Sequence, residues 1–369
     1  MSVITPPGQA PEQQAVPDAP ARDSYLKRLA NLQSVWILGV LLVIVAAFSI
    51  AAGDKFLSTS NFSLISQNIA VWAVLGVGMT FVIITSGIDL SIGSVLVFSS
   101  VVAAKVMQAV GGEGWGVAIL GILAALVSGI AWGVLNGFLI AKAKIPPLIV
   151  TLGSLGMALG LAQILTGGVD IRAVPAVMQD SIGYGNIVGQ VPVLTFIALI
   201  VVIIGGVVLH ATRFGRYTFA VGSNEESARR VGVRVDRHLI MVYALSGLLA
   251  GFAGVLSLAQ FGTTAIAGQT QTNLNVIAAV VIGGTSLFGG VGTIFGTVIG
   301  LFIPAVLQNG FVIVGVQPFW QQVAVGAVLI AAVYIDQRRR AAAARGGKRS
   351  SLRFRSAGKA SPEARGGES

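Results

Sequence analysis

The chain has 369 residues, of which 54% are hydrophobic and only 10% are charged, and its formal net charge is +10. Soluble domains usually carry about 25% charged residues, so the composition excludes an ordinary soluble protein and indicates a membrane protein. The sequence has no cysteine and only two histidines, His210 and His238, which argues against a disulfide framework and a His-based or thiolate metal centre. The positive charge lies in tails and in short loops beside apolar segments, which favours membrane topology over nucleic-acid binding.

About ten apolar segments approach the roughly 20 residues that crossing the hydrocarbon core requires. They lie near residues 35–52, 66–85, 91–109, 117–140, 147–167, 192–210, 239–259, 272–288, 291–309 and 318–335. This pattern predicts an all-α membrane protein with about ten transmembrane helices in a domain that covers residues 35–336. The polar segment 1–34 and the basic segment 337–369 are predicted to be disordered tails.

The first apolar segment could be read as a cleaved signal peptide, because Ser49-Ile50-Ala51 provides a small-x-small site. More than 30 residues precede this segment and its apolar core exceeds what a signal peptide needs, so we expect a retained anchor.

The distribution of cations predicts the orientation of the chain. Cations gather in every second loop: one of these loops has Lys142 and Lys144, and another, the segment 212–238, has six Arg against three acidic residues. In the intervening loops, Lys55 and Arg172 are the only cations. Positive loops stay in the cytoplasm, so both termini are predicted to be cytoplasmic.

One carboxylate, Asp89, interrupts the apolar stretch Gly76–Ser94. An acid between two hydrophobic segments is costly unless it faces protein, water or a partner, so the stretch is either a tight turn at a surface or an interrupted helix lining a pathway. The alternation of spans places residues 85–91 near the cytoplasmic face. We therefore expect Asp89 to cap the following helix or to act in a gate, more than to bind a substrate or to relay protons.

Glycines recur on two predicted helix faces, Gly129/Gly133/Gly137 and Gly292/Gly296/Gly300. Small residues at this spacing let helix backbones approach closely in lipid. We expect these faces to pack within the chain, with a subunit interface as the alternative.

A short charged helix is predicted within the cytoplasmic segment 212–238. Ser223 can cap its start with Glu226 at the capping-box spacing, acids lie in its first turn and arginines in its last, and Gly232 ends it. It is either a solvated loop helix or a docking element for a cytoplasmic partner. Its residues of interest are Ser223, Asn224, Glu225, Glu226, Arg229, Arg230 and Gly232.

Four blocks of sequence carry a resemblance to a known family: Met79–Ser94, Asn136–Gly153, Gly215–Gly232 and Val281–Thr297. Through these blocks, the chain resembles the permease subunit of bacterial ATP-binding-cassette importers for simple sugars, of the ribose, xylose and galactose type. The blocks occur in the same order as in that family, and the resemblance covers roughly residues 36–336. The branched-chain amino acid permeases, which have a related architecture, are the next alternative.

The resemblance implies a permease domain in the bacterial inner membrane that works by alternating access, as a dimer with an identical or homologous permease. It also implies a cytoplasmic ATPase and a periplasmic sugar-binding protein as partners, and it places the coupling helix for the ATPase at residues 223–232.

The chain has no phosphate-binding Gly-x-x-x-x-Gly-Lys-Ser/Thr motif, and the glycine-rich Gly283–Gly290 lacks a lysine. We therefore expect a transport subunit that is not an enzyme and binds no cofactor or metal, with ATP and Mg²⁺ used by the partner ATPase.

Polar groups within predicted spans are candidates for the gate or the substrate pathway, although each could instead form an interhelical hydrogen bond. They are Asp89, Asn68, Thr80, Asn136, Gln163 and Asn275. A transporter that works alone would need membrane-embedded charge pairs or broken helices in both halves, and no docking helix, so it is less favoured, as is a purely structural scaffold.

The charged helix can be tested directly. We predict that Glu226→Ala or Arg230→Glu uncouples transport from ATP hydrolysis and leaves membrane insertion intact, because the helix lies outside the membrane. Uptake and ATP hydrolysis by reconstituted variants measure this, and normal ATP-driven uptake in both variants would count against the assigned helix.

Overall fold

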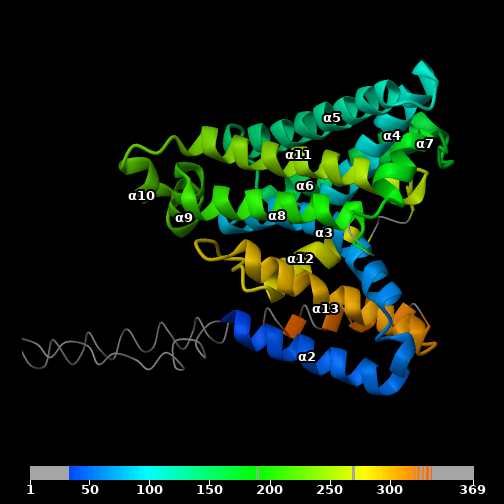
Figure 1. The fold of residues 1–369 in the computed structure, drawn as a ribbon. Helices are drawn as coiled ribbons and strands as arrows, with labels where there is room; N and C mark the ends of the chain where they lie inside the picture. The colour runs from blue at the N-terminus through cyan, green and yellow to red at the C-terminus, as the bar shows by residue number, and fades with distance from the viewer. Residues whose placement is uncertain are drawn as a thin grey trace, which may run out of the picture.

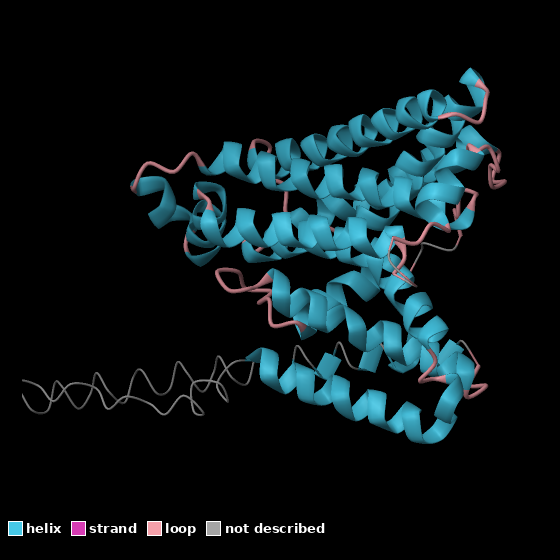
Figure 2. Cartoon of the chain, in the orientation of Figure 1, coloured by secondary structure: helices cyan, strands magenta, loops and turns pink. Residues whose placement is uncertain are grey.

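The computed structural model describes residues 33–334, with gaps at residues 188, 190, 268–270, 318, 321, 325, 328, 329, 332 and 333. Residues 337–369 and all but the last two residues of segment 1–34 lie outside this part, so the predicted disorder of the tails stays a prediction. The described part is a bundle of long helices joined by short loops (Figure 2).

Eight helices of the described part are long and apolar enough to cross a membrane. They are α2 (Gln33–Ala52), α3 (Thr59–Ile84), α4 (Ile92–Val110), α5 (Trp115–Ala141), α6 (Pro147–Thr166), α8 (Val193–Ala211), α11 (Val235–Phe261) and α13 (Ile294–Ile313). Shorter elements connect them: η1 (Gly53–Lys55), α7 (Ala176–Met178), the π-helical turn η2 (Gln179–Gly183), α9 (Arg213–Ser223), α10 (Glu225–Arg230) and α12 (Thr272–Ile282). The prediction of an all-α membrane protein is confirmed.

Residues 272–288 do not form the continuous span that their composition predicts. The helix α12 has only 11 residues, which at about 1.5 Å per residue reach roughly half of the ~30 Å hydrocarbon core. It stops at Gly283 and Gly284, and Gly284 has a φ of +94°. The tenth predicted span, 318–335, falls partly outside the described residues, so the count of ten and the orientation of the termini stay predictions.

The bundle has two ends that differ in character (Figure 1). The helices α9 and α10, the start of α2 and the loop between α5 and α6 lie at one end, here called the α10 end, whereas α7 lies at the other, here called the far end. The Lys142/Lys144 loop and the arginine-rich segment 212–238 are both at the α10 end, as the charge pattern requires.

Both glycine faces pack within the chain, as expected. A Cβ atom on Gly133 would lie 2.3 Å from the backbone oxygen of Tyr243, and one on Gly129 would lie 2.3 Å from that of Gly247, so α5 and α11 are in backbone contact. On α13, a Cβ on Gly300 would lie 2.0 Å from the backbone oxygen of Ala279 in α12. Such close approach gives the dispersion contacts that hold helices together in lipid.

We predict that Gly133→Ala destabilises the protein by about 1–3 kcal/mol, because the new methyl group forces α5 away from α11. Gly156→Ala is the matched control: a Cβ on Gly156 in α6 meets nothing within 4 Å. That control should be neutral or stabilising, since alanine favours the helix by about 0.5–1 kcal/mol over glycine. Thermal unfolding in detergent compares the two, and equal melting temperatures would contradict the packing.

Candidate functional site

The turn between α3 and α4 places a carboxylate among hydroxyl groups. Asp89 is only 3% exposed. Its Oδ1 accepts hydrogen bonds from the backbone N–H of Ser91 at 2.9 Å and from the Ser91 hydroxyl at 2.6 Å, and its Oδ2 accepts one from the Ser246 hydroxyl of α11 at 3.1 Å. These three donors replace the water that the carboxylate would otherwise need.

Asp89 lies inside the bundle, at the level of the first half of α11, and the expected position of residues 85–91 near the cytoplasmic face stays a prediction. Its partner Ser246 is the twelfth of the 27 residues of α11, roughly 16 Å from the start of that helix at about 1.5 Å per residue. The chain folds back after α3: Ser86 has a φ of +63°, and the Gly87 N–H donates to the Val82 carbonyl at 3.1 Å. A Cβ on Gly87 would lie 2.5 Å from the Tyr243 hydroxyl oxygen, so the reversal requires glycine there.

A chain of hydrogen bonds extends from Asp89 to two further helices. The Ser91 hydroxyl accepts a hydrogen bond from Asn136 Nδ2 of α5 at 3.0 Å, and Asn136 Oδ1 accepts one from the Ser154 hydroxyl of α6 at 2.5 Å. Asn136, a predicted pathway residue, is 1% exposed and lies inside this network. The network joins the start of α4 to α5, α6 and α11.

Asp89 organises the turn before α4, and another residue caps the helix itself. The N–H of Gly93, in the first turn of α4, donates to Asn273 Oδ1 of α12 at 2.6 Å. Both α4 and α12 therefore begin at mid-bundle, where their N-terminal ends are linked. Sequence reasoning missed Asn273, Ser91, Ser154 and Ser246, whose only signal was a polar side chain within an apolar segment.

A polar cavity of ≈ 260 Å³ lies in the far half of the bundle. It brings together two predicted pathway residues, Asn68 of α3 and Asn275 of α12, and Asn68 Oδ1 accepts a hydrogen bond from Gln260 Nε2 of α11 at 3.3 Å. Its described lining is Asn68, Val71, Trp72, Gln260, Phe261, Gln271, Thr272, Asn275 and Gln308. None of these described lining residues is charged.

Two predicted pathway residues lie away from this cavity. Thr80 is fully buried in α3, and its hydroxyl oxygen is 2.7 Å from that of Thr297 in α13, which is the interhelical bond given above as the alternative. Gln163 is exposed on α6, close to the far end of that helix.

The charged helix at the α10 end is shorter than predicted and has a different cap. Ser223 is the last residue of α9, and its hydroxyl donates to the Phe219 carbonyl at 2.8 Å. Asn224 is the N-cap of α10, and its Oδ1 accepts the N–H of Ser227 at 2.8 Å. The predicted Ser223 cap is wrong, because α9 continues through this residue. Gly232, with a φ of +88°, follows the helix as predicted.

The two acid–base pairs of α10 lie on different faces. Glu226 and Arg230 pair with each other, and their side chains are 74% and 75% exposed. Arg229 pairs with Glu225 at 3.2 Å and with Asp236, at the start of α11, at 2.8 Å. The hydrogen bonds to Asp236 and Glu225 raise the pKa of Arg229, so its guanidinium stays charged.

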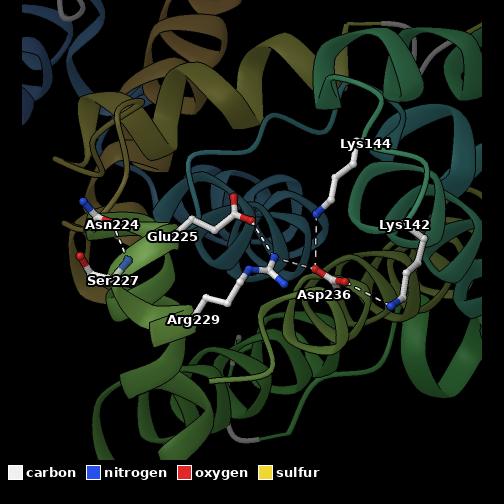
Figure 3. A network of polar contacts seen from close by, with 7 residues as sticks. All are labelled: Lys142, Lys144, Asn224, Glu225, Ser227, Arg229 and Asp236. Carbon is white, nitrogen blue, oxygen red and sulfur yellow. Dashed lines mark hydrogen bonds and ion pairs between the residues drawn. The ribbon is translucent and has the colours of Figure 1, made fainter. Parts of the chain in front are cut away.

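Asp236 also binds the loop between α5 and α6, a contact that the sequence did not predict. Its carboxylate accepts hydrogen bonds from Lys142 at 3.1 Å and from Lys144 at 3.4 Å (Figure 3). A single carboxylate, 20% exposed, therefore holds three cations from two separate elements.

The eight long apolar helices, the neutral polar cavity and the charged helix outside the bundle together define a multi-pass membrane transport protein. The chain belongs to the family described as the permease component of the branched-chain amino acid transport system, whose pattern matches residues 61–333. Members of this family are permease subunits of the bacterial inner membrane and not ATPases.

Three similar proteins carry the names of sugar permeases. The ribose import permease protein of Escherichia coli (strain K12) is 37% identical over 317 residues, which cover 84% of this chain and 95% of that protein. The fructose import permease protein of Rhizobium meliloti is 36% identical over 306 residues, or 81% of this chain and 83% of the relative. The galactose/methyl galactoside import permease protein of E. coli (strain K12) is 33% identical over 312 residues, or 80% and 92%. No solved structure matches the chain.

The hydrogen bonds of Asp89 predict unequal effects of two substitutions. In Asp89→Asn the amide oxygen keeps the Ser91 donors and the amide nitrogen donates to the Ser246 hydroxyl, so stability should fall by only about 1 kcal/mol. Asp89→Ala leaves buried donors without an acceptor and should cost about 2–5 kcal/mol. Thermal unfolding measures both. A stable Asp89→Asn protein that has lost transport would show instead that the charge itself is required.

Proposed function

We propose that this chain is the membrane-spanning permease subunit of an ATP-binding-cassette importer that carries a monosaccharide across the bacterial inner membrane. The names of its relatives, which import ribose, fructose and galactose, support the class of substrate. The observation that carries the proposal is the neutral, amide-rich lining of the far-half cavity.

The chemistry of this lining suits a sugar. Side-chain amides such as those of Asn68 and Asn275 both donate and accept hydrogen bonds, as sugar hydroxyl groups do. Trp72 adds a large apolar surface with a polar N–H, which is suited to a solute with one apolar and one polar face. A branched-chain amino acid brings a carboxylate and an ammonium group, and such charges are costly to desolvate without charged partners. The lining therefore favours a sugar over the amino acid alternative.

The proposed transport cycle uses both ends of the bundle. A periplasmic binding protein delivers the sugar at the far end, and a separate ATPase, which binds ATP and Mg²⁺, docks on α10 in the cytoplasm. A second permease subunit, identical or homologous, completes the pathway. ATP binding drives the change of access only if it stabilises one of the two states more than the other, since a ligand shifts an equilibrium by its differential affinity.

Uptake by proteoliposomes that contain the complete transporter tests this proposal. We predict that Asn275→Leu lowers sugar uptake about three- to tenfold, because one neutral hydrogen bond to the passing sugar is lost. Gln163→Leu is the matched control, since the same class of change falls on the exposed face of α6, outside the cavity. It should leave uptake unchanged.

The opposite pattern, with Gln163→Leu impaired and Asn275→Leu normal, would contradict the cavity as the pathway. Sugar uptake by the chain alone, without ATP or an ATPase, would contradict the importer itself. ATP-driven uptake of leucine in place of a sugar would favour the amino acid alternative.

A further inference from the structure

Asp236 connects the proposed docking helix to the rest of the bundle. It binds Arg229 of α10 on one side and Lys142 and Lys144 of the α5–α6 loop on the other, at 2.8, 3.1 and 3.4 Å. The three cations are themselves about half exposed, so water screens them and each separate pair adds little to the stability of the fold. Their importance lies in the geometry, because one carboxylate joins two separate elements.

Removing this carboxylate would reverse the interaction between the two elements. Arg229, Lys142 and Lys144 all approach the same point, and Glu225 is the only other acid that pairs with them in the described part of the chain. Without Asp236, like charges would face one another across the gap and would repel. The contact between the loop and α10 would then rest on the apolar cluster of Ala141, Val221, Ala228, Val235 and Leu239 alone.

The loop continues directly into the buried network around Asp89. It passes through Pro146 into α6, which begins with Pro147, and the fixed φ of proline limits the freedom of this connection. One turn later, the Thr151 hydroxyl of α6 donates to the Ile88 carbonyl at 3.2 Å, next to Asp89. Ser154 then joins the chain of hydrogen bonds through Asn136.

A second cavity, of ≈ 300 Å³, lies between these elements at the α10 end. Its walls include Glu225 of α10, the loop from Lys144 to Pro147, the turn Thr85–Gly87 and Tyr243 of α11. A displacement of α10 together with the loop would change the width of this cavity on the α10 side of Asp89.

We propose that Asp236 is the positioning residue that transmits movement of α10 to the α5–α6 loop and to the cavity behind it. The neighbouring, more exposed side of α10, with Glu226 and Arg230, contacts the ATPase. This inference rests on the proposed function, and it divides α10 into a docking face and an anchoring face.

The test compares variants of the two faces in the complete transporter, reconstituted with its ATPase and binding protein. In Asp236→Asn the ATPase should copurify as in the parent complex and ATP hydrolysis should persist, while sugar uptake per ATP falls about fivefold or more. Lys142→Gln/Lys144→Gln breaks the same link from the loop side and should show the same loss, and Asp236→Glu should restore coupling. Arg230→Glu, on the docking face, should also lower uptake per ATP, but unlike Asp236→Asn it should reduce copurification of the ATPase.

A measurement of conformational change distinguishes a variant that no longer transmits the movement of α10 from a variant that no longer folds. The sequence has no cysteine, so Ile145→Cys places a single thiol on the wall of the cavity. Its labelling rate should differ between the nucleotide-free and ATP-bound transporter, and this difference should vanish in the Asp236→Asn background.

Two results would overturn the account in distinguishable ways. Parental uptake per ATP in both the Asp236→Asn and the Lys142→Gln/Lys144→Gln transporters would overturn the role of Asp236 and leave the importer standing. Uptake by the parent chain that needs no ATPase would overturn the importer and, with it, this inference.

Discussion

A carboxylate in the middle of an apolar bundle must receive its hydrogen bonds from protein, and this constraint organises the structure around Asp89. The donors come from Ser91 and Ser246, and Ser91 in turn is held by Asn136. Satisfying one buried carboxyl group therefore fixes the positions of α4, α5, α6 and α11 relative to one another. Because partly satisfied polar networks are costly in a medium of low dielectric, we expect these contacts to be kept or exchanged together.

Two helices start inside the bundle close to this network. The α3–α4 turn brings the chain back to the level of Ser246 before α4 begins, and α12 spans only part of the bundle. Asn273 joins the two starts through the Gly93 N–H. Helices that are interrupted inside the bundle leave polar groups that face inward. Here these polar groups lie between the cavity in the far half and the second cavity at the α10 end. Irregular backbone at membrane depth is tolerated where protein or a water-filled cavity surrounds it.

The sequence was informative wherever a local rule decides the structure. Apolar length predicted the eight long helices, and glycine spacing predicted close helix packing within the chain, which α5 and α11 show. The acids and arginines predicted a charged helix at residues 223–232, the region in which α10 lies. The sequence also singled out Asp89 as the one acid within the apolar stretch Gly76–Ser94. Each of these features depends on residues that are neighbours along the chain.

Sequence reasoning failed where contacts between segments far apart along the chain determine the local structure. Ser223 and Asn224 can both cap a helix, and the choice between them follows from the extent of α9. Ser246, which donates a hydrogen bond to Asp89, lies 157 residues away, and the end of α12 depends on a turn at Gly284 that hydropathy does not register. Asp236 was read as one of three acids in a basic segment, because its lysine partners lie more than 90 residues earlier.

The central claim is that α10 and the α5–α6 loop move as one body that is continuous with the Asp89 network. Spin labels on cysteines introduced at the exposed positions Ala143 and Val231 report the distance between these two elements. In the reconstituted transporter, we expect one narrow distance distribution that is the same without nucleotide and with ATP, and a broad one in Asp236→Asn. A distance that shifts between the two nucleotide states while Asp236 is intact would contradict it.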